Sequence, residues 1–241
     1  MTESVRLSKR VADQFTCSRR EAENYIEGGW VRVDGYTTEE PGVRVTPDQT
    51  IELAENARAD ALKPATFILH KPAGYDMTKG PSPLQELITP AMQIPDDRSG
   101  RHFVKKDLNH LEPVMGLEAQ ASGLIVLTQE HGIIRKFASD RAKIEQEYIL
   151  EVAGTPTPDG LQRLNHGLSW QSTPLPPAKV SWQNETHLRF ALKNPPDGLL
   201  QDMCRQVGLE VLSIKRIRIG RVPMRGLPVG QWRYLLGYER F

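Results

Sequence analysis

The sequence has few of the residues that mark a disulfide-stapled or metal-bound protein. Its 241 residues include only two cysteines, Cys17 and Cys204, which lie far apart and form no CxxC pair. Neither a disulfide framework nor a zinc site is therefore expected, and the cysteine content fits a reducing cytosol. The six histidines show no metal-ligand spacing, so we expect no metal.

Long apolar runs and a charge excess of one sign are also missing. No segment approaches the roughly 18 apolar residues that a membrane helix needs, and the polar start "MTESVRLSKR" lacks the apolar core of a signal peptide. We therefore expect a cytoplasmic protein without membrane contact. The formal net charge is only +1, so any signal for a polyanionic partner must be local.

The residues that are present indicate a small N-terminal module over residues 5–53. Leu7, Val11 and Phe15 recur every fourth residue, which predicts one apolar stripe along a helix. Ser18 with Glu21 three residues later forms a capping-box pattern and predicts the start of a second helix. This length of chain suits one medium domain with a small one before it.

A hairpin should follow these helices, because alternating valines flank Asp34-Gly35, which is a typical two-residue turn. Basic residues gather near the starts of the two predicted helices, and they are Arg6, Lys9, Arg10, Arg19 and Arg20. Acidic residues elsewhere in the module offset them, so we expect one basic face. From charge alone, an ordinary solvated surface explains the cluster equally well.

Residues 54–65 are charged and poor in apolar residues, and we interpret them as a linker. Beyond a short apolar strand predicted at 67–69, residues 79–110 are predicted as a long loop with several prolines, the first of them Pro81. Five basic residues of this loop could contact phosphates, namely Arg98, Arg101, His102, Lys105 and Lys106. A disordered, solvated insertion explains the segment equally well. From residue 122 onward, strands and helices alternate without a regular βαβ period, which predicts an α+β fold.

The last 41 residues carry eight Lys or Arg and three Asp or Glu, which gives 8 − 3 = +5 against +1 for the whole chain. A polarised basic segment favours polyanion binding. Within it, Lys215, Arg216 and Arg218 lie on a predicted strand. Strand alternation would send them to different faces, so not all of them can meet one ligand.

Two known families resemble this chain. The segment "RLSKRVADQFTCSRREAENYIEGGWVRVDG" resembles the S-four-type RNA-binding domain, and the rest resembles the catalytic domain of RsuA-type RNA pseudouridine synthases. The segments that carry the second resemblance are "LHKPAGY" (69–75), "PVMGLEAQASGLIVLT" (113–128), "EYILEV" (147–152), "MCRQVGLEVLSIKRIRIG" (203–220) and "LPVGQWRYL" (227–235).

The resemblance implies domains at 1–60 and 61–241, the second built on a mixed, largely antiparallel sheet. It implies a partner that is structured RNA, most plausibly ribosomal RNA, a monomer, and no cofactor. Such enzymes flip a uridine out of RNA, break its glycosidic bond and rejoin the ring through carbon. An aspartate performs the covalent chemistry.

The sequence departs from the family pattern at the substrate slot. The family aspartate falls on Glu118, and the arginine two residues before it falls on Gly116. The other replaced positions are a hydroxyl residue at Ala121, a lysine at Gln146, and arginines at Gly198, Gln201 and Asp202. By contrast, the family tyrosine is kept as Tyr148.

Tyr148 could stack on a flipped base, or it could be a core aromatic of a strand. Lys71, by resemblance, helps to shape the slot, although a plain surface lysine is the alternative. Arg216 and Arg218 lie in the basic C-terminal segment. We therefore add them to the five basic residues of the N-terminal module as candidates for RNA binding.

Two hypotheses follow for the function. In the first, the protein binds structured RNA and has lost most or all catalysis. In the second, Glu118 serves as the nucleophile of an active uridine isomerase. Its extra methylene displaces the carboxylate by about 1.5 Å, and a misplacement of about 1 Å can cost roughly 100-fold in rate. The loss of neighbouring arginine, lysine and hydroxyl groups removes positioning and electrostatic support as well.

The basic cluster yields a first prediction. Replacing Arg19 and Arg20 with alanine should weaken RNA binding and flatten its salt dependence, because each phosphate contact releases a counterion. Titrations of RNA at several salt concentrations measure both effects. An affinity that is unchanged at every salt concentration would show that another face binds RNA.

Overall fold

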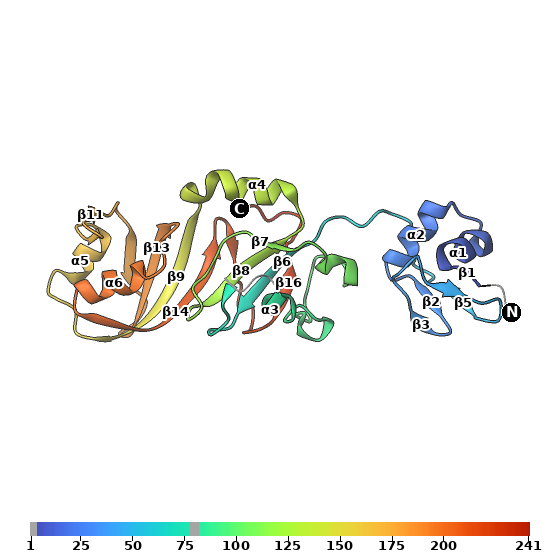
Figure 1. The fold of residues 1–241 in the computed structure, drawn as a ribbon. Helices are drawn as coiled ribbons and strands as arrows, with labels where there is room; N and C mark the ends of the chain where they lie inside the picture. Colours follow the sequence, from blue (N-terminus) through green and yellow to red (C-terminus); the bar gives the residue numbers. More distant parts are fainter. Residues whose placement is uncertain (1–3, 78–81) are drawn as a thin grey trace. The chain divides into compact units, whose positions relative to one another are not determined.

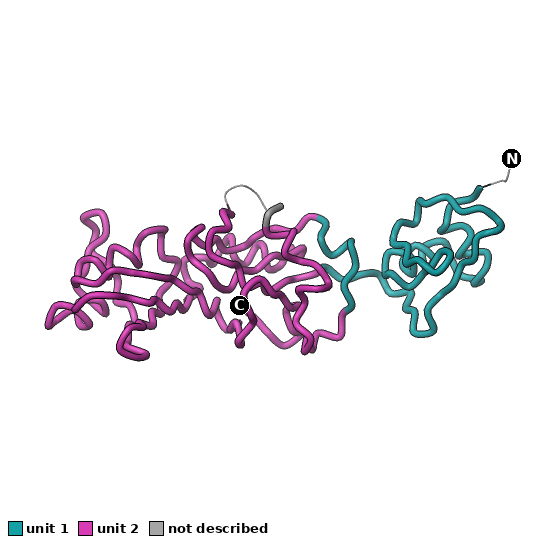
Figure 2. The backbone as a smooth tube through the Cα atoms, turned by 90° about the horizontal axis from the view of Figure 1, so that it is seen from below, with its two compact units in different colours: residues 1–64, 102–109 teal, residues 65–101, 110–241 magenta. Residues whose placement is uncertain are grey.

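The computed structural model describes residues 4–77 and 82–241, and Pro81 of the predicted loop lies outside this range. The chain forms two compact units (Figure 2). Unit 1 contains Met1–Pro64 and His102–Asn109, and unit 2 contains Ala65–Arg101 and His110–Phe241. The predicted domains 1–60 and 61–241 differ from these units in placing 102–109 with the second domain.

Unit 1 packs two helices against small sheets. Its elements are β1 (Val5–Arg6), α1 (Leu7–Phe15), α2 (Arg19–Glu27), β2 (Val31–Val33), β3 (Tyr36–Thr37), β4 (Arg44–Val45), β5 (Ile51–Leu53) and the 3-10 helix η3 (Lys105–Leu108). The strands form the sheets β3-β2-β5 and β1-β4. Leu7, Val11, Ala22 and Ile26 bury the inner faces of both helices, so the predicted helical stripe is confirmed.

Local signals in unit 1 act as the sequence indicates. The Glu21 N–H donates to Ser18 Oγ at 3.2 Å, and the Ser18 N–H donates to Glu21 Oε2 at 2.8 Å, which completes a capping box. Asp34 and Gly35 both have positive φ at the tip of the β2–β3 hairpin. The predicted capped helix and hairpin are therefore confirmed.

Unit 2 is built on a nine-stranded sheet whose central path runs β12-β13-β9-β14-β8-β6-β16, with β15 beside β14 and β7 beside β8 (Figure 1). Its strands are β6 (Thr66–Lys71), β7 (Glu112–Pro113), β8 (Ser122–Thr128), β9 (Glu145–Gly154), β12 (Lys179–Trp182), β13 (His187–Lys193), β14 (Leu209–Ile219), β15 (Val222–Pro223) and β16 (Trp232–Tyr234). Every pairing is antiparallel except that of β8 with β14. The prediction of an α+β fold with a largely antiparallel sheet is confirmed.

Helices cover parts of this sheet. They are α3 (Ser82–Gln85), η2 (Pro90–Met92), α4 (His131–Asp140), η4 (Arg141–Lys143), α5 (Gly160–Asn165) and α6 (Leu199–Gln206). A separate two-stranded sheet joins β10 (Ser169–Trp170) to β11 (Thr173–Pro174). Helix α6 packs against β14, and α5 packs against β12. No helix within the described residues is long and apolar enough to cross a membrane.

The parallel contact between β8 and β14 requires a glycine. Gly123 has φ of +117° and pairs with Arg216 across the two strands. A Cβ atom at Gly123 would lie only 2.3 Å from the Arg216 carbonyl oxygen and 2.5 Å from its nitrogen. Both the backbone conformation and the close approach therefore exclude a side chain, and this contact brings Arg216 beside the first residues of β8.

The core of unit 2 lies on both faces of β8. Residues Leu124, Ile125, Val126 and Leu127 are all fully buried, as expected for a central strand that packs on both faces. Phe137 from α4 closes one of these faces, in the cluster that includes Leu124 and Val126. The strand therefore provides a rigid base for the loop that precedes it.

Candidate functional site

A cavity of about 300 Å³ opens in unit 2 beside the loop that precedes β8. Its walls come from the 113–121 loop, from β9, from the 194–197 segment before α6 and from β14. The residues on which its chemistry depends are Asp76, Gly116, Glu118, Arg141, Gln146, Tyr148, Asn194 and Asp197. Glu118 and Tyr148, both predicted as site residues, therefore meet in one cavity, whereas the basic residues of unit 1 lie elsewhere in the chain.

Both carboxylate oxygens of Glu118 accept hydrogen bonds from the start of α6. The backbone N–H of Gly198 donates to Oε1 at 2.9 Å, and Gln201 Nε2 donates to Oε2 at 2.7 Å. Gly198 is the N-cap residue of α6, where the helix dipole favours a negative charge. Glu118 therefore caps this helix from a different part of the chain.

The backbone of Gly198 suits this role. Its φ of +82° lies in the left-handed region, which glycine adopts without the strain that a side chain would cause. The family pattern expects an arginine at this position. The replacement of that arginine therefore agrees with a backbone that points its N–H toward Glu118.

Tyr148 and Gln146, neighbours on the same face of β9, form the inner wall. The Tyr148 hydroxyl donates to Gln146 Oε1 at 2.7 Å, and Arg216 Nη1 donates to the same oxygen at 3.0 Å. Tyr148 is 4% exposed, and burial raises the pKa of its hydroxyl, with the nearby charge of Arg216 opposing the shift. The phenol therefore stays protonated, and the Gln146 amide nitrogen is the group left to donate to a ligand.

Arg216 is fully buried and does not reach solvent. Its Nε donates to Leu124 O at 2.8 Å, its Nη1 to Gly116 O at 2.6 Å, and its Nη2 to Met115 O at 3.0 Å. Its donors hold the loop that carries Glu118, so the structure gives no support for the prediction that Arg216 binds RNA. Burial lowers the pKa of this guanidinium.

Arg218, two residues further along β14, is held by carboxylates. Its Nη2 lies 2.6 Å from Glu145 Oε1 and 2.8 Å from Glu147 Oε1, and Arg189 also pairs with Glu147. Only 22% of its side chain is exposed. Its charge is therefore neutralised within the sheet, and the structure gives no support for a role in RNA binding.

Lys71, at the end of β6, is also fully buried, so the alternative of a surface lysine is wrong. Its Nζ donates to the carbonyl oxygens of Pro72 at 3.0 Å, Tyr75 at 3.1 Å and Ala119 at 3.0 Å. Burial lowers the pKa of this lysine to about 8, the charge of Arg216 adds to the shift, and Asp76 opposes it. The lysine thus ties the 72–75 turn to the residue after Glu118.

The charged groups that line the cavity are unbalanced. Asp76, Glu118 and Asp197 contribute carboxylates, while Arg141 contributes the one guanidinium among the lining residues that the structure describes. Arg141 donates from Nε to Asn194 Oδ1 at 2.8 Å. The lining itself therefore carries more carboxylates than cations, while the buried Lys71 and Arg216 contact lining residues from behind.

Asp202 adds nothing to that lining. It is absent from the cavity lining, and its carboxylate pairs with Arg205 and accepts from Gln206 Nε2 at 2.7 Å. These two bonds lower the pKa of Asp202. Asp202, which stands where the family pattern has an arginine, therefore places no negative charge in the cavity lining.

The basic candidates of unit 1 lie on β1, α1 and α2. Arg6, Lys9, Arg19 and Arg20 are exposed, and Arg10 is half-buried. Arg19 pairs with Glu23 one helical turn away at 3.1 Å, and both side chains are solvated, so this pair contributes little. The five residues remain a predicted RNA-binding set.

Four of the five basic residues predicted in the 79–110 loop have local partners, and the fifth, Lys105, is exposed. Arg98 pairs with Asp96 at 2.8 Å, and Lys106 pairs with Glu27 at 2.6 Å. Arg101 packs over the Tyr234 ring at 4.9 Å. His102 Nε2 lies 2.5 Å from Gly28 O. These contacts explain the residues without phosphates.

The partners of Glu118 were missed by sequence reasoning, which recorded Gly198 and Gln201 only as lost arginines. The sequence did contain a signal for this contact. Glu118 is longer than the family aspartate, and Gln201 is shorter than the family arginine and neutral. The two replacements compensate in side-chain length, and Gln201 donates a hydrogen bond to Glu118.

Known proteins resemble the chain along nearly its whole length. It is 26% identical over 240 residues to ribosomal large subunit pseudouridine synthase B of Bacillus subtilis, covering 97% of this chain and 93% of that protein. It is 28% identical over 243 residues to the dual-specificity RNA pseudouridine synthase RluF of Escherichia coli K12, covering 98% and 77%. No family model matches the sequence.

The fold has a counterpart among solved structures. A crystal structure of a pseudouridylate synthase superimposes with a TM-score of 0.56 at 18% identity and covers 96% of both chains. At this identity the likeness concerns the fold alone.

The depressed pKa of Lys71 makes stability depend on pH. In the folded protein Lys71 loses its proton near pH 8, whereas in the unfolded chain it keeps the proton until about 10.5. Above pH 8 the unfolded state therefore binds more protons, so the free energy of unfolding should rise with pH, by up to about 3 kcal/mol. Below pH 8 the full burial penalty remains.

Urea denaturation between pH 7 and pH 10.5 measures this rise, and Lys71→Met should lack it. Lys179→Met is the matched control, because Lys179 is exposed on β12. The same pH profile for wild type and Lys71→Met would show that Lys71 does not titrate in this range.

Proposed function

Because the chain belongs to the RsuA-type family of RNA pseudouridine synthases, we propose that it binds structured RNA, with ribosomal RNA as its partner, and no longer isomerises uridine. The observation that carries this proposal is the state of Glu118. Both of its carboxylate oxygens are engaged by the start of α6, which is a structural role.

A nucleophilic carboxylate must present an oxygen to the reacting carbon of the base. For Glu118 this would require breaking its bond to Gly198 or to Gln201, and leaving a helix N–H or a half-buried amide unpaired. An unpaired buried donor costs about 1 to 3 kcal/mol. The barrier to attack would rise by a comparable amount before any chemistry began.

Electrostatics weaken the catalytic hypothesis further. The resemblance expects an arginine at 201, and the residue present is a neutral glutamine that bonds Glu118. A positive group near developing negative charge is usually the largest contribution to catalysis in such sites. Here the lining of the cavity carries three carboxylates and one guanidinium, and Gln201 brings no charge in place of that arginine.

RNA binding does not depend on these groups. The basic set of unit 1, defined by Arg6, Lys9, Arg10, Arg19 and Arg20, supplies the positive charge, in a segment that resembles an S-four-type RNA-binding domain. The names of the relatives support ribosomal RNA as the partner, since one acts on the large ribosomal subunit and another is an RNA pseudouridine synthase of dual specificity.

The competing hypothesis is an active isomerase with Glu118 as nucleophile. It has one observation in its favour, because Glu118 and Tyr148 line the same cavity. It requires α6 to release the carboxylate when RNA binds.

A tritium-release assay on ribosomal RNA labelled at uridine C5 separates the two hypotheses. We expect the wild-type protein to bind this RNA and to release no tritium above background, because Glu118 is committed to α6. The Escherichia coli synthase RluF serves as the positive control that the labelled RNA is competent.

Glu118→Gln is the informative variant, because it keeps the size of the side chain and removes the charge. Tritium release by the wild type that disappears in Glu118→Gln would establish the isomerase and contradict the proposal. Binding of RNA should be the same for both proteins.

A further inference from the structure

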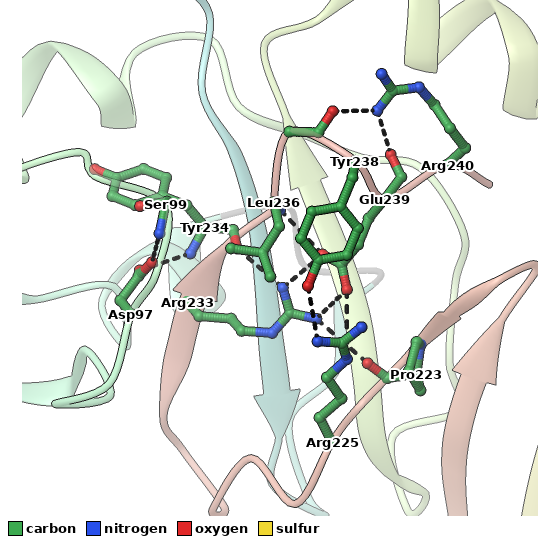
Figure 3. A network of polar contacts seen from close by, with 11 residues as sticks. Asp97, Ser99, Pro223, Arg225, Arg233, Tyr234, Leu236, Tyr238, Glu239 and Arg240 are labelled. Atoms are coloured by element: carbon green, nitrogen blue, oxygen red, sulfur yellow. Dashed lines mark hydrogen bonds and ion pairs between the residues drawn. The ribbon is translucent and has the colours of Figure 1, made fainter.

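Unit 2 has a second cavity, of about 360 Å³, that the proposed function does not use. Residues from two segments, 94–98 and 224–236, line it, and three of the lining residues are arginines: Arg98, Arg225 and Arg233. Several of its groups belong to the polar network shown in Figure 3.

Arg233 and Glu239 form the buried base of this network. The guanidinium of Arg233 contacts the Glu239 carboxylate with two parallel bonds of 2.7 and 2.9 Å, and the two residues are 4% and 5% exposed. Bidentate geometry of this kind is the strongest form of an arginine–carboxylate pair. The charge of Glu239 is therefore already balanced by Arg233.

Arg225 lies above this pair and has no carboxylate of its own. Its Nε is 3.8 Å from Glu239 Oε1, which is a long ion-pair distance to a group that Arg233 already neutralises. Its Nη1 donates to the Tyr238 hydroxyl at 3.0 Å. The side chain is 48% exposed, so a positive charge remains available at the rim of the cavity.

The backbone holds Arg225 in place. Arg225 has φ of +54° and Gly226 has φ of +72°, in a turn closed by the Leu227 N–H donating to Met224 O at 3.2 Å. A non-glycine residue adopts this region only with backbone strain, and strained residues concentrate at ligand sites. The turn is anchored to β14, because the Met224 N–H donates to Ile217 O at 2.9 Å.

Tyr238 places an aromatic ring beside this charge. The ring is 67% exposed, and the Arg225 guanidinium lies 5.7 Å from its centroid. Figure 3 shows Tyr238 next to Arg225, with Arg240 on the neighbouring stretch of chain. Arg240 donates to the backbone carbonyls of Gly237 and Glu239, at 2.8 and 2.6 Å, and among the described residues its charge is also unmatched by a carboxylate.

We propose that Arg225, which lines the cavity, forms a subsite for one nucleotide of single-stranded RNA together with Tyr238 and Arg240, which lie outside the lining. The base stacks on the Tyr238 ring, and the arginines contact the flanking phosphates. Exposed aromatic rings interleaved with basic side chains are the usual platform for unpaired bases. Asp96 also borders the cavity, but Arg98 matches its charge at 2.8 Å.

An acidic peptide is a poorer occupant, because it offers carboxylates to the arginines but no planar group for the ring. The subsite rests on the proposed RNA-binding function and adds a contact on unit 2. The subsite shares no residue with the lining of the cavity that contains Glu118.

The test uses the full-length protein and a fluorescently labelled oligouridine of about 12 nucleotides, which spans the usual site size. Fluorescence anisotropy at several salt concentrations gives the dissociation constant and its salt slope. Tyr238→Ala should raise the dissociation constant about tenfold, because one stacked base is lost. Tyr238→Phe keeps the ring and should bind like the wild type.

Arg225→Ala should weaken binding and lower the salt slope by about 0.7, the value for one phosphate of a single strand. Arg163→Ala is the matched control, since it also removes an arginine of unit 2, on α5, whose side chain is 37% exposed. That control should leave both quantities unchanged. Thermal melting of each variant shows that it is folded, as the exposure of Tyr238 leads us to expect.

The outcomes separate this subsite from the proposed function. Equal affinities of Tyr238→Ala, Arg225→Ala and Arg163→Ala would overturn the subsite alone. A wild-type protein that binds structured ribosomal RNA but not oligouridine would also overturn the subsite. The same holds if poly-glutamate displaces the labelled oligouridine and unlabelled RNA does not. A wild type that binds neither RNA would overturn both the subsite and the RNA-binding function.

Discussion

The guanidinium of Arg216 donates hydrogen bonds to three segments that meet at the cavity. They are the start of strand β8 at Leu124, the preceding loop at Met115 and Gly116, and the side chain of Gln146 on β9. The contact between β14 and β8 that places it there exists only because Gly123 has no side chain. Among the ion pairs of the described residues, Arg216 has no carboxylate partner. The cost of burying its charge, several kcal/mol, is offset by charge-assisted bonds to carbonyl and amide oxygens.

The hydrogen bonds of Arg216 help to fix the position of Glu118. Arg216 holds the loop on one side of Glu118, and Lys71 holds Ala119 on the other. With both flanks fixed, the Glu118 side chain reaches the start of α6, where the left-handed backbone of Gly198 turns its N–H toward the carboxylate. The scaffold of a synthase slot is thereby kept while its carboxylate becomes a helix cap.

Several elements of the fold could be predicted because they depend on interactions between residues close in sequence. The capping box at Ser18 and the turn at Asp34-Gly35 need only neighbouring residues. Strand alternation likewise showed that Lys215, Arg216 and Arg218 could not all face one ligand. It could not show which of them is buried, since arginine is rarely found inside and since β14 carries a bulge between Arg216 and Arg218 that changes the facing of later residues.

The candidate site depended on contacts distant in sequence. Glu118 and Gly198 are 80 residues apart, and Lys71 and Ala119 are 48 apart. Only tertiary packing decides whether a loop carboxylate points into a cavity or onto a helix end. For the same reason the basic C-terminal segment looked like a phosphate surface, although cross-strand glutamates and a buried Glu239 neutralise several of its arginines.

The most direct test of this account is the stability of Glu118→Ala, compared with Glu185→Ala, in which an exposed turn glutamate is removed. If Glu118 caps α6, Glu118→Ala should lower the free energy of unfolding by about 1 to 2 kcal/mol relative to the control. Carboxylates kept for catalysis usually cost stability, and their removal stabilises the fold. A Glu118→Ala protein as stable as the control, or more stable, would contradict the account.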